Sequence, residues 1–138
     1  MGFTLYNEAT GTQYHYVRDI VVFGRNDLEK SLLEAGGTVS DDVKDSLECV
    51  SRRHIRVMKR GGSYEVHNLS KNGTCVNGER IMGSVSALRS GDLIRLGSED
   101  MDTAFAVYFL HNGDAQGFIQ NRVSGTAETD DLSPFRGG

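Results

Sequence analysis

The stretch Ser70-Lys71-Asn72-Gly73-Thr74-Cys75-Val76-Asn77-Gly78 contains two Asn-Gly pairs separated by three residues. Asparagine and glycine accept the positive φ that a sharp chain reversal requires, so we expect a tight turn at each pair. The Asn72 amide is also suited to bonding the main chain of a ligand. Because a single Asn-Gly pair is most often an ordinary hairpin turn, the interpretation depends on the residues around this stretch.

Two earlier fragments carry groups that suit an anion. Arg25 follows Gly24 at the end of the run Asp19–Phe23. Its planar fork can bond two phosphate oxygens at once, and Gly24 has no Cβ to hinder a close backbone approach. An isolated Gly-Arg pair, however, is more often a surface arginine in a salt bridge.

The second fragment is the cluster Ser51-Arg52-Arg53-His54. Ser51 offers a hydroxyl and a backbone N–H just before a predicted strand, and Arg52 adds a positive charge. His54 is better explained as a structural residue that holds loops through its two ring nitrogens than as a catalytic or metal-binding one. In chain order, the three fragments predict a phosphate-binding end on a β scaffold.

Short segments rich in β-branched and aromatic residues recur between turn signals, which is typical of a many-stranded β protein. The predicted strand segments are Phe3–Tyr6, Tyr14–Val22, His54–Met58, Ser63–His67, Leu93–Leu96 and Ala104–Leu110. Apolar and polar residues alternate on both sides of Gly61-Gly62, which indicates an antiparallel hairpin over residues 54–67 with one buried face.

The interval 26–50 differs from its surroundings, because its leucines and valines recur at near-helical spacing and it carries a net charge of −5. We expect short helical turns there, capped at Asn26 or Asp27 and at Ser40. A solvated acidic insertion loop is the simplest role for it.

Composition favours one globular domain. The chain has 138 residues, 38% of them hydrophobic, and a net charge of −4. We expect the domain to cover residues 1–112, followed by a largely flexible extension over 113–138. The sequence has only two cysteines, and it shows no visible secretory signal and no apolar run long enough for a membrane span. We therefore expect an intracellular protein of the nucleus or cytoplasm.

The order of these fragments resembles the forkhead-associated (FHA) domain. The resemblance rests on four motifs and covers roughly residues 3 to 111. They are Gly24-Arg25, Ser51-x-x-His54, Ser70-Lys71-Asn72-Gly73-Thr74-x-x-Asn77-Gly78 and Leu88-x-x-Gly91-Asp92-x-Ile94-x-Leu96-Gly97. It implies an all-β sandwich of two antiparallel sheets with about eleven strands, whose loops at one end bind phosphothreonine in an extended peptide.

The resemblance also implies roles for single residues. Arg25 and Ser51 would contact the phosphate, Arg52 and Lys71 stand where the family often adds phosphate contacts, and Asn72 would bond the peptide main chain. The residues that would mainly shape the loops are Gly24, His54, Gly73, Thr74, Asn77 and Gly78. A small pocket for the threonine methyl group would disfavour phosphoserine. The family is common in signalling chains such as DNA-damage checkpoint kinases. The resemblance therefore implies a reader and not an enzyme, and it is compatible with a reader domain of a larger kinase or signalling protein.

Two departures from the family pattern stand out. Asn68-Leu69 occupies the place where many members have an acidic residue before the Ser-x-Asn-Gly turn. The long acidic 26–50 interval leads directly into Ser51, so its end is expected to border the part of the site that reads the third residue after the phosphothreonine.

Two other function classes compete with a phosphopeptide reader. Nucleic-acid binding would use Arg52, Arg53, Arg56, Lys59 and Arg60. Strand geometry sends alternate residues to opposite faces, and no aromatics are interleaved to stack bases. Catalysis is the other class. The sequence contains no Gly-x-Ser-x-Gly motif for a serine nucleophile and no Gly-x-x-x-x-Gly-Lys-Ser/Thr loop for nucleotide phosphates. The histidines and cysteines have no metal-ligand spacing, so we expect no metal and no cofactor.

A phosphorylation-independent interaction or oligomerisation domain is a further possibility. Thr126 and Thr129 lie in an acidic tail segment. Phosphorylation there would create a ligand for another copy of the domain, although a solubilising tail is the simpler interpretation. No membrane partner is expected.

Overall fold

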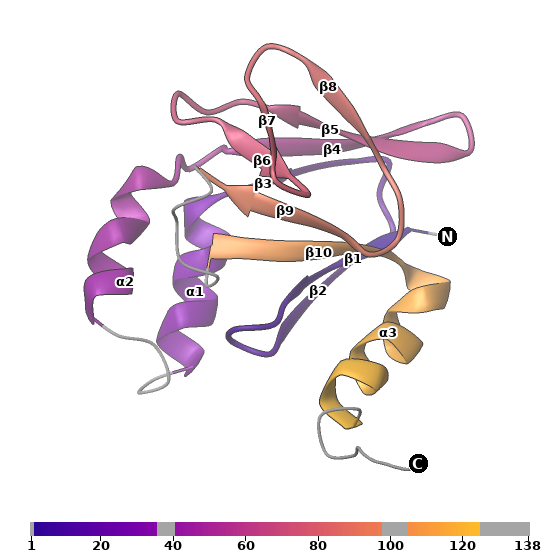
Figure 1. Cartoon of the computed structure of the whole chain (residues 1–138), viewed down its shortest axis with the longest axis horizontal. Coiled ribbons are helices and arrows are strands. Elements are labelled where there is room, and N and C mark those ends of the chain that lie inside the picture. Colours follow the sequence, from indigo (N-terminus) through magenta and orange to yellow (C-terminus); the bar gives the residue numbers. More distant parts are fainter. Residues whose placement is uncertain (1, 36–40, 98–104, 125–138) are drawn as a thin grey trace.

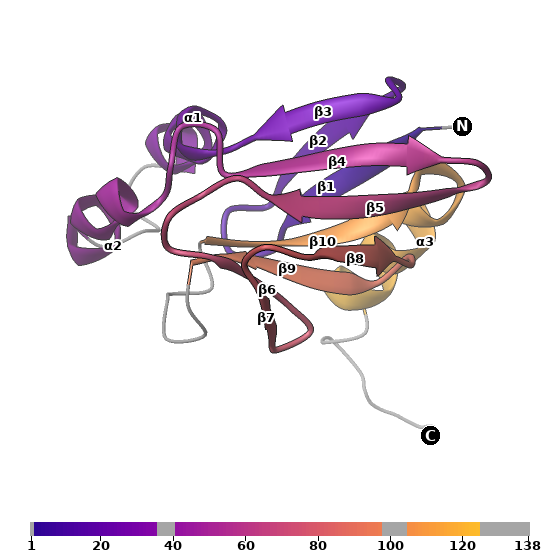
Figure 2. The same ribbon diagram turned by 90° about the horizontal axis from the view of Figure 1, so that it is seen from above.

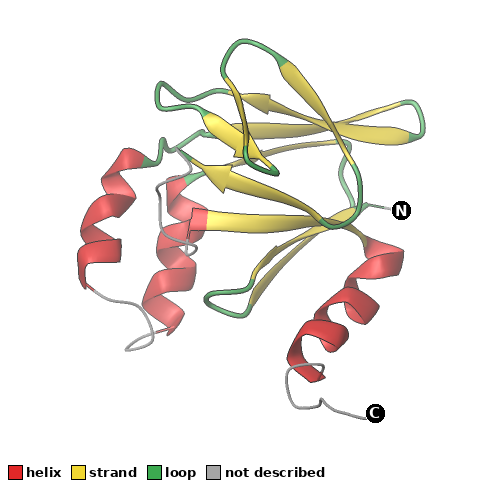
Figure 3. Ribbon diagram, in the orientation of Figure 1, coloured by secondary structure: helices red, strands yellow, loops and turns green. Residues whose placement is uncertain are grey.

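The computed structural model describes residues 2–35, 41–97 and 105–124. Within these ranges the chain forms ten strands in two antiparallel sheets, with helices at both ends of the strands (Figure 1, Figure 3). The strands are β1 Phe3–Asn7, β2 Thr12–Tyr16, β3 Ile20–Phe23, β4 Ile55–Arg60, β5 Ser63–Asn68, β6 Thr74–Val76, β7 Glu79–Ile81, β8 Val85–Leu88, β9 Asp92–Leu96 and β10 Ala106–His111. The helices are α1 Arg25–Ala35, α2 Asp41–Ser46, the 3₁₀ turn η2 Leu47–Cys49, and α3 Asn112–Ser124.

The two sheets face each other as a sandwich (Figure 2). One has six strands in the order β2-β1-β10-β9-β6-β7, and the other has four in the order β3-β4-β5-β8. The rings of Phe3, Tyr64 and Phe109 pack against one another between the sheets in edge-on and tilted orientations, with ring centroids 5.1 to 5.6 Å apart. Alternate apolar residues of both sheets fill the remaining core. The predicted all-β sandwich is confirmed.

The hairpin of β4 and β5 forms as the alternating pattern predicts, with Val57 paired to Val66 on the buried face and Gly61 at φ 62° in the turn. The prediction of one strand over Tyr14–Val22 was wrong. The chain forms β2 in one sheet and β3 in the other, and the exposed residues 17–19 carry it across between the layers.

The acidic interval 26–50 is attached to the sandwich by its apolar residues, as the helical spacing predicts. Leu28 and Leu32 of α1 are 0% and 1% exposed, and Val50 is fully buried. The Tyr14 hydroxyl donates to the Asp27 carbonyl over 3.1 Å, which ties α1 to β2. These contacts fix the position of the helix that begins at Arg25.

The extension from residue 113, expected to be largely flexible, begins with α3. This helix packs on the outer face of β1 and β10 through Ala115, Phe118 and Ile119, and covers Tyr6 and Leu110. Arg122 pairs with Glu8 at 2.6 Å and lies 4.6 Å above the Tyr108 ring. The sparse apolar residues after 112 had given no clear helical pattern, and residues 125–138 lie outside the described ranges.

Among the described residues, no helix is both long and apolar enough to cross a membrane.

Candidate functional site

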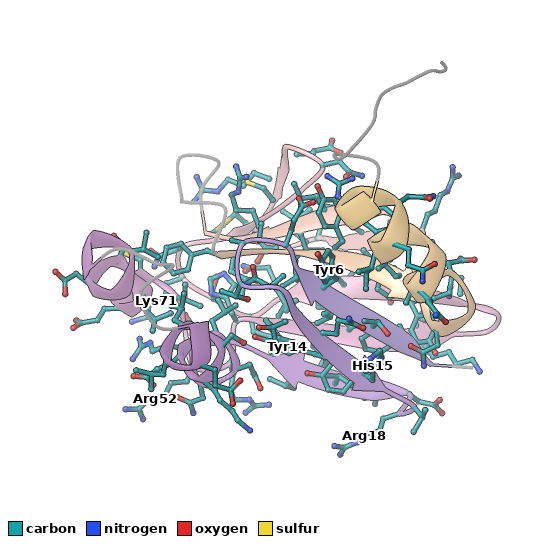
Figure 4. The ribbon with its side chains drawn as sticks, turned by 90° about the horizontal axis from the view of Figure 1, so that it is seen from below. Tyr6, Tyr14, His15, Arg18, Arg52 and Lys71 are labelled. Carbon is teal, nitrogen blue, oxygen red and sulfur yellow. The ribbon has the colours of Figure 1, made fainter. Side chains whose placement is uncertain are left out.

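Three loop segments meet at the end of the sandwich that carries α1 and α2. They are the corner between β3 and α1, the segment 48–54 before β4, and the turn 70–73 before β6. Figure 4 shows Arg52 and Lys71, both exposed, at this end. The structure therefore brings together the three sequence fragments that suggested an anion site.

Gly24 lies where the corner touches the backbone before β4. A Cβ built on Gly24 would stand 2.2 Å from the Arg52 carbonyl oxygen and 2.5 Å from that of Ser51. No larger residue fits without moving the chain. Gly24 also begins α1: its carbonyl accepts from the Leu28 N–H, and its own N–H donates to the Asp27 carboxylate over 3.0 Å.

Arg25 is held by backbone carbonyls on the facing segment. Its Nε donates to the Val50 carbonyl over 2.7 Å, and its Nη2 donates to the Glu48 carbonyl over 3.2 Å. Its backbone N–H donates to the Ser51 carbonyl over 2.9 Å. Two of the five guanidinium N–H groups are thus used to fix the fork, and the others are available to an external acceptor.

A pocket of about 360 Å³ opens beside this arginine. It is lined by Arg25, Asn26, Glu29, Leu47, Glu48 and Arg52. The acidic insertion therefore supplies part of the wall next to the candidate phosphate site.

His54 joins the segments from inside. Its ring is fully buried. Nδ1 accepts the Ser51 N–H over 3.1 Å, so Nε2 carries the proton and donates to the Gly73 carbonyl over 2.7 Å. Burial lowers the pKa of His54, against a smaller opposing effect of the Gly73 hydrogen bond. Because the Ser51 N–H is taken by this ring, only the hydroxyl of Ser51 is left to a ligand; the sequence had suggested both groups.

Asn68 organises the turn before β6. Its Oδ1 accepts from the Ser70 N–H, the Ser70 hydroxyl and the Thr74 hydroxyl over 3.2, 2.7 and 2.9 Å. Its amide donates to the carbonyls of Ser70 and Met82. A neutral side chain thus makes the acceptor contacts at the position where the family often has an acid. Sequence reasoning noted the departure but missed this role, although an Asx residue before a turn is a recognised signal.

Asn72 and Gly73 form the tip of this turn. The Asn72 side-chain amide donates to the Cys49 carbonyl over 2.6 Å. Gly73 has φ 88°, and its carbonyl also accepts from the Gly97 N–H over 3.1 Å. The positive φ at Gly73 agrees with the Asn-Gly pattern.

The second Asn-Gly pair is not part of the group formed by Arg25, Ser51 and Asn72. Asn77 and Gly78 have φ values of 51° and 86° and form the turn between β6 and β7. The Asn77 side chain donates to Asp92 and accepts from the Leu93 N–H, over 3.0 and 2.9 Å. This pair braces β9.

The basic residues that suggested nucleic-acid binding do not share one surface. Register places Arg56 and Arg60 on the outer face of the four-stranded sheet and Lys59 on the other face. Arg60 pairs with Glu65 at 3.7 Å. Among the described residues, no group of three or more His, Cys, Asp or Glu side chains is arranged to hold a metal ion.

A family model described as FHA domain matches residues 21–97, more than half of the chain. The chain belongs to the FHA domain family. FHA domains are binding modules and not enzymes. A comparison with curated proteins finds no significant match.

Several solved structures are similar to this FHA domain. Mycobacterium tuberculosis EmbR in complex with a low affinity phosphopeptide is 28% identical with a TM-score of 0.54, covering 79% of this chain and 24% of EmbR. The FhaA FHA domain complexed with the intracellular domain of Rv3910 is 26% identical with a TM-score of 0.52, covering 78% and 98%. A domain from a study of phosphothreonine-dependent FHA interactions is 23% identical with a TM-score of 0.54, covering 81% and 98%, and shows the fold alone.

Proposed function

We propose that this FHA domain binds threonine-phosphorylated segments of partner proteins. The observation that carries the proposal is the position of the Arg25 guanidinium. Two backbone carbonyls, of Glu48 and Val50, hold it next to the segment that leads into Ser51. Within the described part of the chain, no carboxylate lies within 4.0 Å of this guanidinium. A fixed cation without an internal counter-ion suits a phosphate of about −1.5 to −2 charge.

Each remaining residue of the site has a role in this proposal. The Ser51 hydroxyl completes the phosphate contact, and the exposed side chains of Arg52 and Lys71 add charge (Figure 4). Asn72 bonds the ligand main chain, exchanging its present bond to the Cys49 carbonyl for one to the peptide. The residues that hold the site loops in shape are Gly24, His54, Gly73 and Thr74, whereas Asn77 and Gly78, also expected to do so, brace β9 instead.

The relatives support this proposal. EmbR was solved with a phosphopeptide, and the FhaA domain with a domain of another protein. Since this chain spans about a quarter of EmbR, only the binding of a phosphorylated segment is carried over, and the activity of the whole protein is not.

The direct test is a titration with one fluorescent peptide library in three versions. The central residue is phosphothreonine, phosphoserine or unmodified threonine, and the third residue after this central residue is varied in each version. We expect micromolar binding to phosphothreonine and none to threonine. Phosphoserine should bind at least about fourfold more weakly, because one methyl contact is worth ~0.8 kcal/mol. Equal binding of the threonine and phosphothreonine versions would contradict the proposal.

The proposal extends to the setting of the domain. A reader of phosphothreonine assembles signalling complexes after a kinase has acted, and this chain would do so in the nucleus or cytoplasm, either alone or within a larger kinase or signalling protein.

We also propose that the protein associates with itself through its phosphorylated tail. Thr126 and Thr129, which lie outside the described residues, would bind the site of another copy once phosphorylated. Native mass measured before and after phosphorylation should then show a dimer or larger species only in the phosphorylated sample. The variant in which both threonines are replaced by alanine serves as the control. A phosphorylated protein that stays monomeric would rule out self-association through the tail.

A further inference from the structure

Arg80 lies on β7 beside the Asn72-Gly73 turn. Its Nη2 donates to the Asn72 carbonyl over 3.1 Å. A Cβ built on Gly73 would stand 2.9 Å from Arg80 Nε and 2.7 Å from Met82 Sδ. These two side chains therefore pack over the α-carbon of the turn, and this packing holds the guanidinium next to the residue proposed to bind the ligand main chain.

Hydrogen bonds connect Arg80 to Arg25 across this end of the molecule. Arg25 donates to two carbonyls of the segment 48–50, and the third carbonyl of that segment accepts from the Asn72 amide. The Asn72 carbonyl in turn accepts from Arg80. Along this series of bonds, Asn72 stands between the two arginines. An extended peptide that placed its phosphate on Arg25 and its main chain on Asn72 would have Arg80 within reach of its flanking residues.

The charge of Arg80 has no internal partner within the described residues. Its side chain is exposed, and no described carboxylate lies within 4.0 Å of it. Arg60 and Arg122, in contrast, pair with Glu65 and Glu8. One N–H group of Arg80 donates to the Asn72 carbonyl. The other donors of this fixed guanidinium are available to a ligand. This combination suits an anion that the ligand supplies.

We propose that Arg80 binds an anionic side chain of the ligand, on the side of Asn72 away from the phosphothreonine. The anion is a carboxylate or a second phosphate. The inference rests on the proposed function, because the phosphothreonine and Asn72 set the register that brings the second anion to Arg80. Recognition then requires two negative charges at a fixed spacing, which narrows the set of segments that bind.

The test uses one phosphothreonine peptide in which each flanking position is replaced singly by alanine, aspartate, phosphoserine or lysine. Each peptide is titrated against the wild-type protein, Arg80→Gln and Arg80→Lys. We expect aspartate or phosphoserine at one position to tighten wild-type binding about fivefold over alanine. Arg80→Gln should lose this gain and Arg80→Lys should keep part of it. The gain should shrink in 0.5 M salt, because the pair is exposed.

Arg89→Gln is the matched control. Arg89 is an exposed arginine between β8 and β9, next to Ser90, whose hydroxyl donates to Asp114 of α3. Its replacement removes the same charge at the end of the sandwich away from α1 and α2. Arg89→Gln should keep the wild-type preference for the anionic residue.

Each contrary result has a distinct meaning. If Arg80→Gln weakens all peptides by the same factor, Arg80 only holds Asn72 in place and the second-anion site is wrong. A wild-type protein that binds phosphothreonine peptides without any preference for a flanking anion overturns this inference and leaves the proposed function intact. If the wild-type protein binds none of the phosphothreonine peptides, both this inference and the proposed function are wrong.

Discussion

Arg25→Ala is expected to weaken phosphopeptide binding by about 2–5 kcal/mol, or roughly 30-fold to several thousand-fold. The phosphate would be buried against the loops without the fork that neutralises it. Arg25→Lys should recover only part of this loss, because an ammonium group cannot reproduce the two parallel bonds or the contacts to the carbonyls of Glu48 and Val50. Isothermal titration calorimetry with one phosphothreonine peptide measures all three proteins.

Arg18→Ala is the control for this experiment. Arg18 is an exposed arginine between β2 and β3, and Figure 4 shows it well away from Arg52 and Lys71. Its removal should leave the affinity unchanged at moderate ionic strength. The circular dichroism of Arg25→Ala must match that of the wild type, since Arg25 also anchors η2. A folded Arg25→Ala protein with wild-type affinity would show that the phosphate binds elsewhere.

His54→Ala is expected to lower the free energy of unfolding by about 3–5 kcal/mol. The substitution leaves a cavity and removes the partners of the Ser51 N–H and the Gly73 carbonyl. A loss of this size is a large part of the ~5–15 kcal/mol that stabilises a typical domain. Urea unfolding monitored by tyrosine fluorescence gives the value directly. His15→Ala, at an exposed histidine that contacts Thr4, should cost much less.

His54 also predicts a dependence of stability on pH. Burial lowers its pKa in the folded protein, whereas the unfolded chain takes up the proton near the ordinary value of about 6.5. The unfolded state therefore binds more protons in this window. The contribution of His54 to stability is complete above pH 6.5 and is lost as the pH falls toward and through the folded pKa. His54→Gln, which cannot titrate, should show a smaller fall in unfolding free energy between pH 7 and pH 5. An equal fall in both proteins would mean that other groups cause it.

The parts of the fold that the sequence predicted are those in which a local pattern and the tertiary structure agree. The alternation around Gly61 specifies the β4–β5 hairpin, because both strands have one buried face. The spacing of Leu28 and Leu32 predicts α1, because these residues enter the core. The short strands β6, β7 and β8 carry little periodicity in three or four residues each, so no pattern could reveal them.

The candidate site was predictable where a residue type has few alternatives. A glycine at the crowded corner of Gly24, a buried histidine between two loops and Asn-Gly turns all leave a mark on the sequence. Arg80 leaves none, because an exposed arginine on a short strand has no distinctive spacing, and its place beside Asn72 depends on the pairing of β6 with β7. The helix α3 was missed because its two glycines and its few apolar residues resemble a linker, whereas the outer face of β1 supplies the packing.

The neutral amide of Asn68 has an electrostatic consequence for the ligand. A carboxylate at this position would add a fixed negative charge near a phosphate bound at the proposed site, and their repulsion would grow as ionic strength falls. The amide accepts the same three donors without that field. Residue 68 therefore adds nothing to the repulsion from Glu29 and Glu48 in the pocket wall, and it leaves undiminished the attraction by which nearby cations speed association with an anion in dilute buffer.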